Sequence, residues 1–322
     1  MLFEITGILL GLILLVFGAD RFVTGAANIA RILGMPPLII GLTVVGIVTS
    51  APEILVGSVA ALEGKTEMAI GNAIGSNIAN IGMVLGISVL ITPMVITSRT
   101  LRREYRLMLM SAVIAPLLLI DQELSRADSV ILIFTLAGCM YWIIKIARQT
   151  ARNDPLINEY KQELSANTSM VQSIIFLIAG LVLLLGGAEL LVRCSILVAE
   201  HFGISDLVIG LTIIAVGTSL PELAASVMCA IKNEADIAVG NVIGSNMFNM
   251  LAVIGIPGLI HPTGFDDRVL FRDFPVMLGL TLVMGWMVFI HGAGKFDRIE
   301  GAFLLICFVS YQYWLFAGGG PA

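Results

Sequence analysis

The chain has 322 residues, of which 58% are hydrophobic and 13% are charged, with a formal net charge of −5 and a mean hydropathy of +0.98. A soluble domain carries about 25% charged residues, so this chain has too few charges to cover a water-exposed surface. The composition excludes a soluble enzyme, a disordered chain and a nucleic-acid-binding protein, which would need a basic face. Lipid must therefore be the solvent for most of the molecule.

Ten apolar stretches are long enough to span a bilayer, since a spanning helix needs roughly 20 mostly apolar residues. In chain order they cover 3–32, 36–62, 67–91, 102–120, 127–148, 170–199, 205–231, 235–260, 270–290 and 299–316. We expect an all-α integral membrane protein with ten transmembrane helices. The first stretch is expected to be a retained helix and not a cleaved signal peptide, because no basic segment precedes it.

The distribution of Lys and Arg between loops predicts the orientation, because cytoplasmic loops carry an excess of these residues. If the N-terminus lies outside, 12 Lys and Arg fall in inside loops and 4 in outside loops. We therefore expect a multi-pass protein of the cell membrane with both termini outside and the 149–169 connector in the cytoplasm. This connector is too short to form a folded domain.

An internal repeat is the most informative feature of the sequence. Residues 38–86 align with 207–255 at a constant offset of 169, and 20 of the 49 aligned positions are identical. The identities fall mainly on polar residues and glycines, which chance similarity between apolar helices does not explain. Each copy contains five spans, an odd number, so the second copy enters the membrane from the opposite side. We expect two inverted-topology five-helix repeats, 1–149 and 170–322, joined by a connector at 150–169.

The second and seventh spans each contain a Thr-Ser-x-Pro-Glu segment, at 49–53 and 218–222. A proline inside a helix lacks an N–H and clashes with the carbonyl four residues earlier. Pro52 and Pro221 therefore predict broken helices with freed carbonyl groups. In hydrocarbon such a carbonyl needs a partner, and a bound cation can be that partner.

Two acidic residues, Glu53 and Glu222, lie near the middle of these spans, where an ionised carboxylate costs several kcal/mol. In each copy the Thr and Ser at four and three residues before the acid are expected to share its helix face. Hydroxyl, carboxylate and carbonyl oxygens suit Ca²⁺, Mg²⁺ or Na⁺, and not Zn²⁺ or Cu⁺. The four cysteines are scattered and predict neither a metal site nor a disulfide.

The third and eighth spans each contain Gly-Asn-x-x-Gly-Ser-Asn, at 71–77 and 240–246, followed three residues later by another Asn. The glycines allow close helix approach, and we expect these two helices to be broken as well. A serine and an asparagine four residues apart share one face in each copy. These four residues are Ser76, Asn80, Ser245 and Asn249.

Other polar residues of the spans have structural interpretations. For Asn72 and Asn241, ion binding and satisfaction of backbone groups are equally good explanations. Asp20 and Glu189 occupy equivalent positions in the two copies, and we favour a structural role at an interface for both. Glu189 and Arg193 are four residues apart, which predicts an ion pair within the helix.

The two carboxylates give the site a charge of −2, which one Ca²⁺ or two Na⁺ would neutralise. Mutually exclusive occupancy of this kind is what an antiporter needs. A cation channel is an alternative, since channels also use oxygen-lined pores. An intramembrane enzyme is disfavoured because the spans contain no Ser/Lys, Asp/Asp or His-Glu-x-x-His arrangement, and a scaffold would leave the acids unexplained. No cofactor, no nucleic acid and no obligate protein partner is expected.

At these doubled motifs the sequence resembles the calcium/cation antiporter superfamily, in particular prokaryotic sodium/calcium exchangers. The resemblance implies alternating access by sliding of the first and sixth helices, and one Ca²⁺ site flanked by Na⁺ sites. It implies that the threonines give carbonyl oxygens to Ca²⁺ and hydroxyls to Na⁺, that the serines serve Na⁺, and that the asparagines line the central position. The implied ligands are Glu53, Glu222, Thr49, Thr218, Ser50, Ser219, Ser76, Ser245, Asn80 and Asn249, with the carbonyls of Gly46 and Ala215 as weaker candidates.

Two positions depart from the family pattern. Val48 stands where the motif usually has glycine. Many sodium/calcium exchangers have aspartate where this chain has Asn249, so this site has two carboxylates and not three. The coupling ion is therefore open between Na⁺, H⁺ and K⁺. The segment 75–77, Gly-Ser-Asn, favours Na⁺ because proton/calcium exchangers usually carry Glu in this motif.

Overall fold

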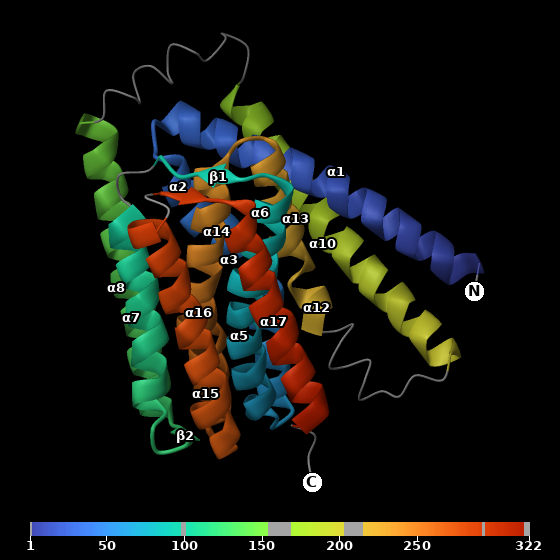
Figure 1. Ribbon diagram of the computed structural model, residues 1–322, viewed down its shortest axis with the longest axis vertical. Coiled ribbons are helices and arrows are strands. Elements are labelled where there is room, and N and C mark those ends of the chain that lie inside the picture. Colours follow the sequence, from blue (N-terminus) through green and yellow to red (C-terminus); the bar gives the residue numbers. More distant parts are fainter. Residues whose placement is uncertain (1, 98–100, 154–168, 203–214, 292–293, 319–322) are drawn as a thin grey trace.

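The computed structural model describes residues 2–97, 101–153, 169–202, 215–291 and 294–318, and nearly all of them are helical (Figure 1). The first half contains α1 (Leu2–Leu33), α2 (Pro37–Ile40), η1 (Gly41–Val45), α3 (Gly46–Thr49), α4 (Ala51–Leu62), α5 (Thr66–Ala79), η2 (Asn80–Leu85), α6 (Gly86–Ile91), β1 (Met94–Val95), α7 (Leu101–Leu118), β2 (Glu123–Leu124) and α8 (Arg126–Asn153). The elements named η are π-helical. The 154–168 part of the connector lies outside the described residues.

The second half contains α10 (Met170–His201), α12 (Ala215–Thr218), α13 (Leu220–Ile231), α14 (Ala235–Phe248), η4 (Asn249–Val253), α15 (Gly255–Ile260), β3 (Thr263–Gly264), η5 (Val269–Asp273), α16 (Phe274–Trp286), η6 (Met287–His291), β4 (Lys295–Phe296) and α17 (Arg298–Gly318). The short strands form two antiparallel pairs, β1 with β4 and β2 with β3. Each pair joins a loop of the first half to a loop of the second half, so the two halves are interleaved.

Among the described residues, seven helical segments are long and apolar enough to cross a membrane. They are Phe3–Leu33, Pro37–Leu62, Thr66–Ile91, Arg126–Lys145, Met170–Val198, Ala235–Ile260 and Val269–His291. The other three predicted spans correspond to α7, to α12 with α13, and to α17, which are outside this set. Part of the predicted 205–231 span lies outside the described residues.

Two long helices, α1 and α10, pack against each other and run in opposite directions, set obliquely to the remaining bundle (Figure 1). Small residues allow their close contact. A Cβ atom at Gly18 would lie 2.4 Å from the backbone nitrogen of Leu184, and one at Gly180 would lie 2.2 Å from that of Phe22. Glycine at these positions lets the two backbones touch.

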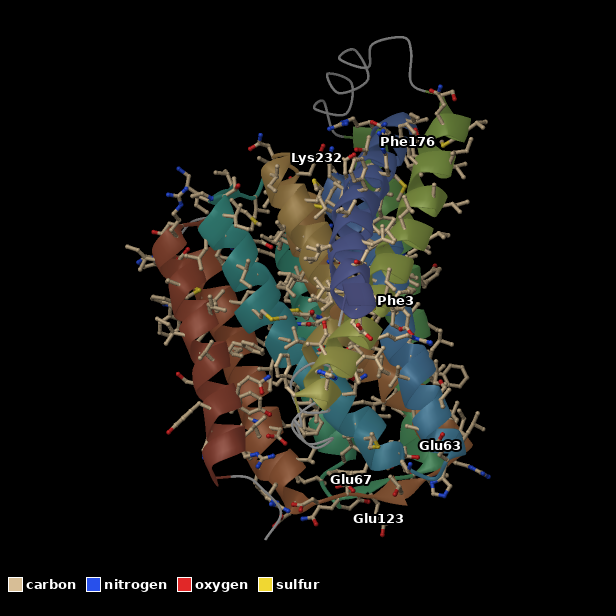
Figure 2. All side chains as sticks on the ribbon, turned by 90° about the vertical axis from the view of Figure 1, so that its right-hand side faces the viewer. Phe3, Glu63, Glu67, Glu123, Phe176 and Lys232 are labelled. Atoms are coloured by element: carbon tan, nitrogen blue, oxygen red, sulfur yellow. The ribbon has the colours of Figure 1, made fainter. Side chains whose placement is uncertain are left out.

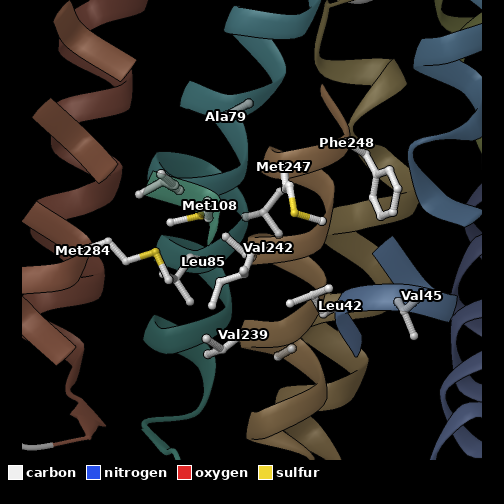
Figure 3. Close-up of a cluster of buried hydrophobic side chains, with 14 of the residues drawn as sticks. Leu42, Val45, Ala79, Leu85, Met108, Val239, Val242, Met247, Phe248 and Met284 are labelled. Atoms are coloured by element: carbon white, nitrogen blue, oxygen red, sulfur yellow. The ribbon is translucent and has the colours of Figure 1, made fainter. Parts of the chain in front are cut away.

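The central helices are α5 with α6 and α14 with α15, whose apolar windows are the most deeply buried of the seven. A cluster of apolar side chains from these helices, η1, α7 and α16 fills the space between them (Figure 3). It includes Leu42, Leu85, Met108, Val242 and Met284. The polar motif residues are therefore held by a packed apolar shell.

The element boundaries of the two halves repeat at the offset of 169. The corresponding pairs are α3 with α12, α4 with α13, α5 with α14, α6 with α15 and β1 with β3. The turn between α4 and α5 contains Gly64, whose φ is 77°. The equivalent turn between α13 and α14 contains Asn233, whose φ is 59°. The sequence repeat is thus also a repeat of backbone conformation.

The helices with the Thr-Ser-x-Pro-Glu segments are interrupted, as predicted. Ser50 has φ and ψ of −83° and 2°, and Ser219 has −88° and 3°, in each case between two helices. The proline occupies an early position of the second helix, where its missing N–H costs little. Thr49 ends α3 while Glu53 lies in the first turn of α4, so they do not share one face of a continuous helix as the sequence suggested.

The third and eighth helices are not broken, contrary to the expectation. Asn80 has φ and ψ of −62° and −41° and Asn249 has −61° and −45°, so helical geometry continues through both. At these residues α5 widens into η2 and α14 widens into η4. A π-helical turn accommodates an extra residue without interrupting the helix.

At one end of the molecule, two ion pairs connect α1 to the turn between α13 and α14. Lys232 Nζ lies 2.7 Å from an oxygen of Asp20, and Arg31 pairs with Glu234. The predicted pair between Glu189 and Arg193 within α10 is present. Asp20 therefore has the structural role at an interface that its position suggested.

Candidate functional site

Two carboxylates from different halves of the chain lie in the interior. Glu53 in α4 and Glu222 in α13 are each only 1% exposed, and Ser50, three residues before Glu53, contacts Glu222. Each lies in the first turn of a 12-residue helix. The partial positive charge of a helix N-terminus favours an anion there, which offsets some of the cost of burying the carboxylate.

The hydroxyl groups next to the helix breaks join the two halves. Ser50 Oγ donates to Glu222 Oε1 at 3.5 Å, so the break of the first copy contacts the acid of the second. Thr49 Oγ1 donates to Asn241 Oδ1 at 3.1 Å and lies 3.4 Å from Ser245 Oγ. Four predicted site residues are thus brought into one cluster together with Asn241.

A second set of contacts joins the asparagines of α5 and α14. Asn77 Nδ2 donates to the backbone oxygen of Asn246 at 3.1 Å, and Asn80 Nδ2 donates to Asn246 Oδ1, also at 3.1 Å. These three side chains and Asn249 are at most 2% exposed. Asn77 and Asn246 are separated by 169 residues, so the two copies meet at equivalent positions.

Six buried oxygen atoms in this region have no hydrogen-bond partner among the described residues. They are Glu53 Oε2, Glu222 Oε2, Ser219 Oγ, Asn77 Oδ1, Asn80 Oδ1 and Asn249 Oδ1. An unpaired buried polar atom costs about 1–3 kcal/mol, and more when it is charged. Oxygen atoms of these kinds are the ligands that Na⁺ and Ca²⁺ prefer, so a desolvated cation would satisfy them.

The remaining predicted residues lie near these clusters or at their edge. Ser76 is buried in α5, and the Gly46 carbonyl accepts a hydrogen bond from Ser245 Oγ at 3.5 Å. Thr218 ends α12 and is partly buried. Ala215 is the first residue of α12, and its side chain lies outside the described part of the structure.

Sequence reasoning left four polar residues out of the site: Asn77, Asn246, Asn241 and Ser226. The first three are identical in both copies of the repeat, and this identity could have identified them. Ser226 gave no such signal, because Gly57 is at the equivalent position. Its hydroxyl accepts from Asn241 Nδ2 at 3.0 Å.

Comparison with known proteins identifies the family to which this chain is similar. The family described as "Sodium/calcium exchanger protein" matches residues 3–145 and 172–317. The chain is 45% identical to CaxA of Alkalimonas amylolytica over 96% of this chain and 98% of CaxA. It is 39% identical to the inner membrane protein YrbG of Escherichia coli K12 over 96% of each chain.

A solved structure of the sodium-calcium exchanger NCX_Mj, soaked with Na⁺ and Ca²⁺, superimposes with a TM-score of 0.84 at 32% identity and covers all of both chains. The sequence match and the structural match both extend over nearly the whole length. The fold is thus that of a multi-pass membrane exchanger and not that of an enzyme. The chain belongs to the sodium/calcium exchanger family.

Proposed function

We propose that this protein is a secondary antiporter that exchanges Ca²⁺ for Na⁺ across the cell membrane by alternating access. The observation that carries the proposal is the group of unpartnered oxygen atoms around two buried carboxylates from opposite halves of the chain. The charge of the pair is matched by one Ca²⁺ or by two Na⁺. The two loaded forms therefore exclude each other, and the empty form retains two uncompensated charges in a low-dielectric interior.

We assign the twelve predicted residues to this site, with Glu53 and Glu222 shared between Ca²⁺ and Na⁺. Thr49 and Thr218 give carbonyl oxygens to Ca²⁺ and hydroxyls to Na⁺, and Ser50, Ser76, Ser219 and Ser245 serve Na⁺. Asn80 and Asn249 line the centre, and Gly46 and Ala215 contribute carbonyls. The close contacts among Ser50, Glu222, Thr49 and Ser245 support this assignment.

We further propose ten transmembrane helices in two inverted repeats, 1–149 and 170–322, with the connector 150–169 in the cytoplasm and both termini outside. Two hydrogen bonds between the halves support the repeat. The Thr97 N–H donates to Asp236 Oδ1 at 3.1 Å, and the Asp266 N–H donates to Glu67 Oε1 at 3.0 Å. Each bond maps onto the other at the offset of 169. The opposite directions of α1 and α10 support the inversion (Figure 1).

The side-chain distribution supports a membrane-crossing orientation along the long axis. Charged residues mark the two ends, with Lys232 at one end and Glu63, Glu67 and Glu123 at the other (Figure 2). Large apolar side chains are exposed on the helices, including Phe134 at 74% and Ile290 at 73%. Lipid is the partner that such a surface requires. The proposed function needs no cofactor and no second protein.

The test is uptake of ⁴⁵Ca²⁺ into proteoliposomes with an outward gradient of Na⁺, K⁺ or H⁺ imposed in turn. Uptake driven by the Na⁺ gradient is the expected result. Uptake driven by K⁺ or H⁺ instead would support an antiporter, with that ion and not Na⁺ as the coupling ion. Equal uptake without any gradient, unaffected by Ca²⁺ on the opposite side, would identify a channel and contradict the proposal.

A further inference from the structure

The amide of Asn241 connects hydroxyl groups from three helical segments. Its Oδ1 accepts from Thr49 Oγ1 of α3 at 3.1 Å and from Ser245 Oγ of α14 at 3.5 Å. Its Nδ2 donates to Ser226 Oγ of α13 at 3.0 Å. Asn241, Thr49 and Ser245 are completely buried and Ser226 is 1% exposed. The four polar groups form one continuous network away from water.

In this network the nitrogen end of the Asn241 amide faces Ser226 and the oxygen end faces Thr49. An asparagine amide has an oxygen that accepts and a nitrogen that donates, and the two can exchange places by a rotation. With the amide nitrogen bonded to Ser226, the amide oxygen lies toward Thr49 and Ser245. In this arrangement Thr49 donates its hydroxyl proton to Asn241, and its oxygen can accept a cation.

The first copy lacks this arrangement. Gly57 is at the position equivalent to Ser226, so no hydroxyl exists there. Asn72 is equivalent to Asn241, and its Nδ2 is buried without a hydrogen-bond partner among the described residues. The amide that faces Thr49 is therefore bonded to a serine, whereas the position equivalent to that serine in the other copy is a glycine.

We propose that Ser226 and Asn241 are positioning residues that orient the Thr49 hydroxyl for Na⁺. The inference rests on the proposed function, in which Thr49 gives its hydroxyl to Na⁺ and its backbone carbonyl to Ca²⁺. Loss of the orienting network then weakens Na⁺ binding and leaves Ca²⁺ binding unchanged. The network orients the hydroxyl of Thr49 for Na⁺. The equivalent position in the other copy lacks the serine on which the network depends.

The experiment compares two transport modes of the same reconstituted protein. Ser226→Ala is expected to raise the Na⁺ concentration that gives half-maximal Na⁺-driven Ca²⁺ uptake about fivefold, the scale of one buried hydrogen bond. The Ca²⁺ concentration for half-maximal Ca²⁺/Ca²⁺ exchange, which needs no Na⁺, should stay the same. Asn241→Ala removes the acceptor itself and should give the same selective change.

Two further variants separate positioning from general destabilisation. Ser226→Thr keeps the hydroxyl and should restore the Na⁺ dependence of the unmodified protein. Ser58→Ala in α4 removes a hydroxyl that bonds to the Ile54 carbonyl of its own helix, and should change neither transport mode. Gel filtration and thermal melting in detergent check that each variant is folded.

Equal weakening of both transport modes in Ser226→Ala and Asn241→Ala would overturn the inference, as would an unchanged Na⁺ dependence in both. The unmodified protein is measured in parallel. If it shows no Na⁺-driven Ca²⁺ uptake, the proposed function itself fails. If it shows uptake but the variants are not selective for Na⁺, only the inference about Ser226 and Asn241 fails.

Discussion

Each buried acid is placed where its carboxylate is least costly. Pro52 and Pro221 lie at the starts of α4 and α13, and this puts Glu53 and Glu222 in first turns, near the positive ends of these helices. The sequence predicted the acids, the breaks and the neighbouring hydroxyls because proline chemistry and doubling identify them without a structure. It could not predict Ser226, because contact between α13 and α14 depends on packing that no repeat records.

Replacing either acid by its amide tests the electrostatic basis of the site. We expect Glu53→Gln and Glu222→Gln each to abolish Ca²⁺ exchange, because one remaining carboxylate cannot balance a divalent ion. The thermal midpoint should not fall, since removal of one buried charge relieves repulsion with the other. Transport is measured in proteoliposomes and stability by melting in detergent. Normal flux in either variant would contradict the shared site.

Asn249 sets the charge of the empty site at −2 in our proposal. Asn249→Asp adds a third carboxylate, and one Ca²⁺ would then leave a charge of −1 uncompensated. We expect more Na⁺ to be coupled to each Ca²⁺. The measurement is the Na⁺ gradient at which net Ca²⁺ flux stops, and a null point identical to that of the unmodified protein would show that this position does not affect coupling. Asn249→Gln keeps the charge and is the matched control.

At the scale of elements, the glycines of the second motif in α14 produce a close crossing and not a helix break. A Cβ atom at Gly244 would lie 2.2 Å from the backbone oxygen of Leu42, and one at Gly240 would lie 2.3 Å from that of Leu38. Sequence alone could not distinguish these outcomes, because glycine permits both a distorted helix and a close approach. The π-helical turns at Asn80 and Asn249 were likewise not predictable from spacing.

Gly244→Ala is expected to separate α14 from η1, because the added methyl group meets backbone that cannot move aside alone. Overpacking of this kind costs about 1–3 kcal/mol, so the thermal midpoint should fall and transport should be lost. Gly279→Ala in α16 is the control, since nothing described lies within 4 Å of its added Cβ. Equal melting temperatures for the two variants would show that the crossing tolerates a side chain.

At the scale of the whole molecule, doubling was predictable because it leaves identities at a constant offset, and the element boundaries follow the same offset. The pairing of β1 with β4 and of β2 with β3 was not predictable, since two-residue strands have no periodicity. Three of the ten predicted spans are not among the seven described segments that are long and apolar enough to cross a membrane, and one of the three, α7, begins with several charged residues.

Accessibility labelling tests the proposed orientation. We expect a cysteine introduced at Glu123 to react with an impermeant maleimide in right-side-out vesicles, and one at Asn158 in the connector to react only after permeabilisation. Substitution of the four native cysteines provides the background. The reverse pattern would place the connector outside and invert the assignment from Lys and Arg.

One of the two ion pairs on α1, between Asp20 and Lys232, has no counterpart of opposite charges in the other copy. Asp20 meets Lys232, whereas the equivalent residues Glu189 and Glu63 are both acidic. A motion that exchanged the roles of the copies would therefore replace an attraction by a repulsion between like charges. The two end states of such a cycle differ in energy, and dissolved salt reduces that difference by screening. The duplicated architecture of this chain is thus not energetically symmetric, because the attraction between Asp20 and Lys232 has no equivalent in the other copy.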